Sequence, residues 1–153
     1  MIQKNSAVCR VFDYALDYNK NANIELKEIE DSFASAANYL NKIGWKKNEP
    51  CFYKVELSEK IPKKYLNTSA KKIVNKKKLS FFKKYIKNSE NIPEKDNLLV
   101  GIITPDKDII PGSSNINPAY VVFPNYELIL KWNRSLRFAL AVCTLKNKFK
   151  DEI

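Results

Sequence analysis

The sequence contains no histidine, and only three of its 153 residues are arginine. The absence of histidine excludes a Ser-His-Asp triad, a Cys-His dyad and a histidine-ligated zinc site within this chain. No apolar run approaches the roughly 20 residues that a membrane-spanning helix needs. Residues 1–6 lead into a stretch interrupted by Arg10 and Asp13, which does not fit a secretory signal. A chain expressed as written is therefore expected to be cytoplasmic.

Cysteine is also scarce, with only Cys9, Cys51 and Cys143 present. The number is odd, and the spacing is far too wide for a CxxC metal or redox motif. The pattern favours three buried or half-buried thiols. A single disulfide is compatible with the sequence, but nothing in the sequence indicates one.

The chain does have enough apolar material for a folded core. Hydrophobic residues make up 44% and aromatic residues 12% of it, which excludes a disordered chain. The length fits one domain or a part of a larger one. Lys and Arg total 27 against 17 Asp and Glu, for a net charge of +10. Asn and Ile are abundant as well, so this charge is a weak argument for any particular partner.

Apolar periodicity predicts the order helix, small sheet, basic helix, strands, helix. Residues 28–43 have helical spacing, with acidic residues in the first turn and Gly44 after the last. Residues 133–149 predict a closing helix. Between them, residues 51–130 predict strands and a basic helix. The strands are expected at 51–57, 98–103 and 119–123, and one amphipathic basic helix, or two short ones, at 69–88; residues 126–132 predict either a strand or a helix start.

Residues 17–28 match the spacing of an EF-hand calcium loop. The oxygen ligands at positions 1, 3, 5 and 12 would be Asp17, Asn19, Asn21 and Glu28, with the backbone carbonyl of Asn23 at position 7. Position 6, normally glycine, is Ala22, and only two of the four side-chain ligands are charged. The segment therefore predicts either a weak Ca²⁺ site or an Asn-rich turn of the same shape.

A lysine cluster occupies residues 71–87, with Phe81, Phe82 and Tyr85 interleaved. Aromatic rings among cations are typical of nucleic-acid surfaces, because the rings stack on bases. Here the rings fall at helical spacing and predict core, and the cluster has no arginine to make forked contacts. The sequence therefore does not favour a nucleic-acid partner.

A third candidate site begins at Tyr126 and continues through Trp132, Asn133 and Ser135. The indole offers a flat apolar face to a sugar ring, and the amide and hydroxyl offer directional hydrogen bonds. The segment predicts either a sugar-binding corner at the start of the closing helix or a Trp132 that is simply buried in the core.

Several segments together resemble the C-terminal part of lytic murein transglycosylases of the membrane-bound type B. Residues 34–40, ASAANYL, followed by IGW at 43–45, resemble the family pattern A-S-x-A-N-Y-L…H-G-W. Residues 49–53, EPCFY, resemble E-P-W-G-Y, with Cys51 in place of tryptophan. The remaining matches are FPNY at 123–126, ILKWNRS at 129–135 and FALAV at 138–142.

The resemblance implies a lysozyme-like α+β fold, mostly helical, with a small antiparallel sheet across a single region of residues 1–153. Family members cleave the bond between N-acetylmuramic acid and N-acetylglucosamine in peptidoglycan, forming a 1,6-anhydro product. One glutamate acts as acid and then as base, and no cofactor is required. The family's location is the periplasm or cell envelope. Some members carry an EF-hand-like loop where residues 17–28 lie.

The catalytic glutamate of the family belongs to an E-[ST]-x-[YF]-G segment upstream of the helix at 28–43, and we find no such segment here. None of the glutamates has that context; they are Glu25, Glu28, Glu30, Glu49, Glu56, Glu59, Glu90, Glu94, Glu127 and Glu152. The leading hypothesis is a C-terminal transglycosylase fragment that is inactive alone and able to pair with a separate N-terminal piece. The alternatives are a non-catalytic peptidoglycan-binding module and a basic polyanion-binding protein.

Overall fold

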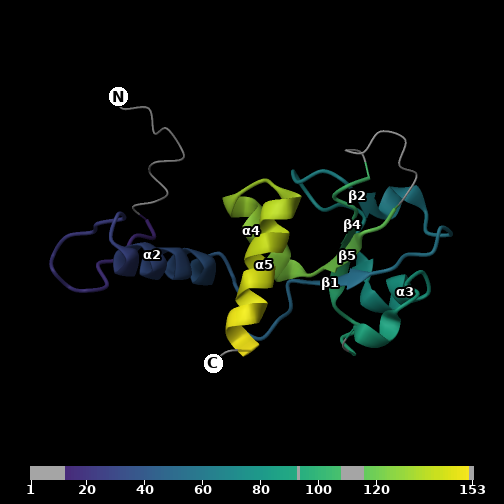
Figure 1. Ribbon diagram of the computed structural model, residues 1–153, viewed down its shortest axis with the longest axis horizontal. Coiled ribbons are helices and arrows are strands. Elements are labelled where there is room, and N and C mark those ends of the chain that lie inside the picture. Colours follow the sequence, from purple (N-terminus) through teal and green to yellow (C-terminus); the bar gives the residue numbers. More distant parts are fainter. Residues whose placement is uncertain (1–12, 93, 108–115, 152–153) are drawn as a thin grey trace. The chain divides into compact units, whose positions relative to one another are not determined.

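The computed structural model describes residues 13–92, 94–107 and 116–151. The chain divides into two compact units between Lys47 and Asn48 (Figure 1). The first unit contains helix α2 (Ile29–Lys42). The second unit contains, in order, β1 (Phe52–Val55), β2 (Leu66–Asn67), β3 (Lys77–Lys78), α3 (Leu79–Lys83), β4 (Leu99–Ile103), β5 (Ala119–Val122), α4 (Pro124–Trp132) and α5 (Leu136–Asp151). No described helix has the length and apolar character required to span a bilayer.

Helix α2 holds the preceding segment of the chain through its polar side. The Ser35 hydroxyl accepts a hydrogen bond from the Leu16 N–H at 2.9 Å, and the Asn38 amide donates to the Tyr14 carbonyl at 2.9 Å. These two side chains belong to the ASAANYL segment, so its polar residues act as backbone anchors. The helix lies where the periodicity predicts it, within one residue at each end.

The apolar side of α2 is largely uncovered at its N-terminal half. Ile29 and Phe33 are 70% and 72% exposed, whereas the polar residues Asp31 and Ser35 are buried. The usual arrangement of an amphipathic helix is therefore inverted within this unit.

The sheet of the second unit has the order β1-β5-β4-β2, and β3 pairs with β4 away from that path. The pairs β1–β5, β4–β5 and β3–β4 are antiparallel, as the prediction of a small antiparallel sheet requires. The short pair β2–β4 is parallel and departs from it. All three predicted strands are present.

The two faces of this sheet are covered by different elements. The register places Val55, Val121 and Ile102 on one face, where they share a buried cluster with Leu79 and Phe82 of α3. The opposite face carries Val122 and Ile103, which are also buried. Figure 1 shows α3 and the packed pair α4 and α5 on opposite sides of the strands. The α+β class predicted from the sequence is confirmed.

The predicted basic helix at 69–88 is wrong for most of its length. Only α3 is α-helical there, and the preceding residues form a loop and the two-residue strand β3. Ile73 packs so closely on β4 that a Cβ added to Gly101 would overlap its side chain. Asn75 has a φ of 54°, which interrupts a right-handed helix. Tertiary contacts therefore override the local pattern in this segment.

Cys51 and Cys143 form a disulfide between the residue before β1 and helix α5, with their Cα atoms 6.0 Å apart. Both side chains are buried. The prediction of unpaired thiols is therefore wrong for these two residues, which lie 92 positions apart in the sequence. Cys9 lies outside the described residues.

Candidate functional site

The predicted sugar-binding corner forms the turn between α4 and α5. Trp132 is the last residue of α4 and is 52% exposed. Asn133 is exposed, and Ser135 is partly exposed. The Ser135 hydroxyl accepts the Phe138 N–H at 3.2 Å, so it caps the first turn of α5. The structure thus brings a half-exposed indole and an exposed amide together at one turn.

Tyr126 does not belong to this exposed group. Its side chain is completely buried, and its hydroxyl donates a hydrogen bond to the Leu136 carbonyl at 2.7 Å. Burial, with a smaller contribution from Tyr120, raises the pKa of the Tyr126 hydroxyl above its ordinary value. A buried side chain cannot contact a polysaccharide, so we assign Tyr126 to the core, where it joins α4 to the start of α5.

The corner is supported by the loop that precedes β1. The buried Asn125 amide donates to the Glu49 carbonyl at 3.1 Å, and the Lys146 ammonium group of α5 donates to the same carbonyl at 3.4 Å. The EPCFY and FPNY segments therefore meet through Glu49 and Asn125. Sequence reasoning aligned both segments with the family but did not assign them to each other.

The start of α5 is also tied to the loop after β4. Arg137 forms an ion pair with Asp106. Burial, followed by the nearby Asp106 charge, raises the pKa of Tyr120 on β5. The ring of Tyr120 meets that of Phe52 edge to face, with centroids 5.5 Å apart. These contacts fix the beginning of α5 relative to the sheet and so position the corner.

In the loop at residues 17–28, side-chain oxygens accept backbone N–H groups of the same loop. Asp17 accepts the N–H groups of Asn21 and Ala22 at 3.1 and 2.8 Å, and Asn19 accepts the same Asn21 N–H at 3.1 Å. Oxygens at positions 1 and 3 therefore converge. Ala22, at position 6, has a φ of 70°, the conformation for which glycine is normally used.

Asp31 joins this loop to helix α2. Its two carboxylate oxygens accept the N–H groups of Tyr18 and Glu25 at 2.8 and 2.9 Å. The hydrogen bond from Glu25, then that from Tyr18, lowers the pKa of the Asp31 carboxyl below its ordinary value, against the opposing effect of burial. The Asp31 carboxylate therefore joins both ends of the loop to helix α2. From the sequence alone, only the acidic first turn of the helix was noted.

The loop has the oxygen ligands that Ca²⁺ prefers, but few of these ligands carry a negative charge. Amide, carboxylate and backbone oxygens are the ligands that Ca²⁺ takes. Among the described residues, no three acidic, cysteine or histidine side chains gather in one place. Glu28, at position 12, is exposed. The loop therefore carries oxygen donors of the kind that Ca²⁺ takes, but few of them are charged.

A protein-family model matches most of the chain. Residues 10–147 match the Transglycosylase SLT domain, so the chain belongs to that family. The resemblance deduced from the sequence motifs is thereby confirmed. A comparison with curated proteins gave no match.

Solved lytic transglycosylases have the same fold. SltB3 from Pseudomonas aeruginosa, in complex with NAG-anhNAM-pentapeptide, is 24% identical with a TM-score of 0.74, over 91% of this chain and 35% of that one. SltB1 from the same organism is 22% identical with a TM-score of 0.65, over 89% and 42%. Escherichia coli Slt35 in complex with calcium is 19% identical with a TM-score of 0.63, over 90% and 39%. The chain therefore spans well under half the length of these proteins.

Proposed function

We propose that this chain supplies part of the glycan-binding wall of a lytic transglycosylase that acts on peptidoglycan, without supplying the catalytic acid. The observation that carries the proposal is the family match over residues 10–147 together with the exposed indole of Trp132 beside Asn133 and Ser135. The related SltB3 structure contains a NAG-NAM-pentapeptide, which supports a glycan of this class as the ligand.

Some of the acids that the structure describes in the second unit are held in ion pairs. Three carboxylates form ion pairs, namely Glu127 with Lys76, Asp96 with Lys83, and Asp106 with Arg137. An acid catalyst must start protonated and lie within about 3 Å of the glycosidic oxygen. We therefore assign no catalytic role to these three carboxylates. Because none of the glutamates has the family's E-[ST]-x-[YF]-G context, we propose that a separate polypeptide segment of the same family provides the acid.

The disulfide supports a location in the cell envelope. Disulfides persist in oxidising compartments such as the periplasm and are rare in the cytosol. Cys51 and Cys143 are 1% and 0% exposed, so the bond is part of the core. We propose the envelope as the place where this chain acts, in contrast to the cytoplasmic location expected from the sequence as written.

The proposal predicts binding to peptidoglycan without turnover. Purified sacculi should sediment the chain but release no anhydromuropeptides, and Trp132→Ala should weaken binding about tenfold, because an exposed indole contributes roughly 1–1.5 kcal/mol of contact. Phe33→Ala, which removes another exposed aromatic ring, is the matched control. Equal binding by the two variants would contradict the glycan assignment, and anhydromuropeptide release by this chain alone would contradict the missing acid.

We also propose that residues 17–28 bind Ca²⁺ weakly, on the strength of the converging Asp17 and Asn19 oxygens and the positive φ of Ala22. With few charged ligands, the dissociation constant is expected on the order of 10⁻⁴–10⁻³ M. Titration calorimetry with Ca²⁺ should show this binding, and Asp17→Asn should abolish it. Glu30→Gln removes a nearby charge outside the ligand set and should leave it unchanged. Identical titrations for both variants would show that Ca²⁺ does not bind in the loop.

A further inference from the structure

The excess of positive over negative charge in this protein is confined to one segment. Residues 60–95 contain 12 of the 24 lysines and only two acidic residues, Glu90 and Glu94. The remaining 117 residues contain 15 basic and 15 acidic side chains, so they carry no net charge. The whole net charge of +10 therefore lies in a segment of 36 residues. A general enrichment in lysine along the chain does not explain such confinement.

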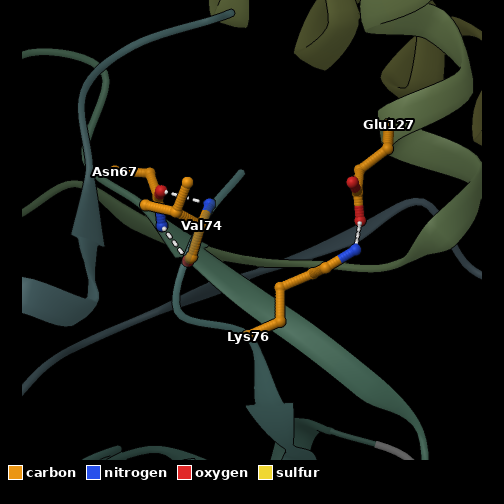
Figure 2. Close-up of polar contacts among 4 residues, drawn as sticks. All are labelled: Asn67, Val74, Lys76 and Glu127. Carbon is orange, nitrogen blue, oxygen red and sulfur yellow. Dashed lines mark hydrogen bonds and ion pairs between the residues drawn. The ribbon is translucent and has the colours of Figure 1, made fainter. Parts of the chain in front are cut away.

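Most of these lysines point to solvent. Lys76 is paired with Glu127 at 2.8 Å, as Figure 2 shows, and Lys83 is paired with Asp96. The exposed members of the segment are Lys60, Lys63, Lys64, Lys71, Lys72, Lys77, Lys78, Lys84, Lys87 and Lys95. Since lysine chains are flexible and strongly hydrated, they suit a diffuse anionic ligand better than one that needs a rigid fork of donors.

Two of the exposed lysines flank one aromatic cluster. Tyr65, Phe81 and Phe82 contact one another edge to face, with ring centroids 5.3–5.6 Å apart. The ammonium group of Lys64 lies 5.2 Å from the centroid of Tyr65. That of Lys84 lies 4.4 Å from the centroid of Phe81. Cation–π contacts of this kind hold both ammonium groups close to the surface of the cluster.

These contacts also bear on the kind of ligand. Single-stranded nucleic acids bind by stacking their bases on open aromatic faces. Here Lys84 lies over Phe81 and also 5.0 Å from the centroid of Tyr85, while Phe82 is completely buried. The surface therefore presents ammonium groups in place of stacking platforms. It suits a ligand recognised by its negative charges alone.

We propose that this basic surface, built around Lys64 and Lys84, binds the carboxylates of the peptides that peptidoglycan carries, at a site separate from the Trp132 corner. The choice of peptidoglycan as the polymer rests on the proposed function. That the ligand must be negatively charged follows from the exposed lysines alone. A peptide attached to a glycan strand carries at least its terminal carboxylate, and many copies repeat along the polymer. Several weak lysine–carboxylate contacts then act together, and salt screens them.

The experiment measures sedimentation of the full chain with purified sacculi at low and high salt. Lys64→Gln/Lys84→Gln should weaken binding about tenfold at low salt and flatten the salt dependence, since each lysine near an anionic surface contributes on the order of a tenfold factor or less. Lys27→Gln/Lys47→Gln removes the same charge from exposed positions of the first unit and should change binding little. Lys64→Arg/Lys84→Arg should retain the salt-dependent binding. Sacculi whose carboxylates have been amidated should no longer show the salt-dependent part of the binding.

The outcomes separate this proposal from the proposed function. Loss of binding by Trp132→Ala, with no effect of the Lys64 and Lys84 variants relative to their control, would overturn the basic surface and leave the glycan corner intact. The reverse result would support the basic surface and overturn the corner. Unchanged binding to amidated sacculi, or tighter binding to single-stranded DNA than to sacculi, would overturn the assignment to carboxylates.

Discussion

Reduction of the Cys51–Cys143 disulfide is expected to lower the free energy of unfolding of the second unit by about 4–5 kcal/mol. The bond closes a loop between residues 92 positions apart, so it removes a large part of the conformational freedom of the unfolded chain. Urea denaturation with and without dithiothreitol, followed by circular dichroism, measures the difference. A Cys9→Ser background prevents exchange with the third thiol.

The control for this prediction is Cys51→Ala/Cys143→Ala, which should unfold at the same urea concentration with and without reductant. Its stability should lie at or below that of the reduced protein, because both sulfur atoms occupy the core. Coincident curves for the oxidised and reduced chain would show that the disulfide contributes nothing to stability.

Asn67→Ala is expected to lower the free energy of unfolding by about 3 kcal/mol, since it leaves several buried backbone groups without partners. The Asn67 amide donates to the carbonyls of Ile102, Tyr65 and Val74 at 2.9, 3.2 and 3.3 Å, and its carbonyl accepts the Val74 N–H at 2.8 Å. Figure 2 shows the two-way contact with Val74. The side chain is only 4% exposed, so water cannot replace these bonds. Urea denaturation measures the loss.

Two variants test the cause of this loss. Asn67→Asp keeps the acceptor for Val74 but removes the donors and buries a charge, so it should destabilise at least as strongly as Asn67→Ala. Asn97→Ala removes an exposed amide whose contact with Lys78 is 3.5 Å long, and it should change stability by less than about 0.5 kcal/mol. A small effect of both Asn67 variants would contradict the anchoring role.

The sequence predicted the elements whose pattern depends only on local spacing. Helix α2, helix α5 and strands β1, β4 and β5 lie where periodicity indicates, because their apolar spacing and end signals agree. Residues 126–132 fitted either a strand or a helix. The structure makes them helical, starting at Pro124, which is well suited to the first turn of a helix.

The errors fall where distant residues decide the outcome. The segment at 69–88 has the composition of a basic helix. Its first part instead packs on the sheet, because Val74 is hydrogen-bonded to Asn67 and Ile73 contacts Gly101. No local pattern reveals that Cys51 meets Cys143. Trp132 and Tyr126 were both predicted to contact a sugar, since each is an aromatic side chain with a polar group. Only the packing shows that Trp132 is exposed and Tyr126 is completely buried.

The Cys51–Cys143 bond closes residues 51–143, from just before β1 to the middle of α5, into a covalent ring. A protease that cuts one peptide bond inside this ring, for example in the exposed stretch at Lys71 and Lys72, would open the chain without separating its two parts. The whole sheet would stay tethered to its covering helices, and only a reducing agent would release the pieces. A single cut within this ring therefore leaves the two parts of the second unit covalently connected.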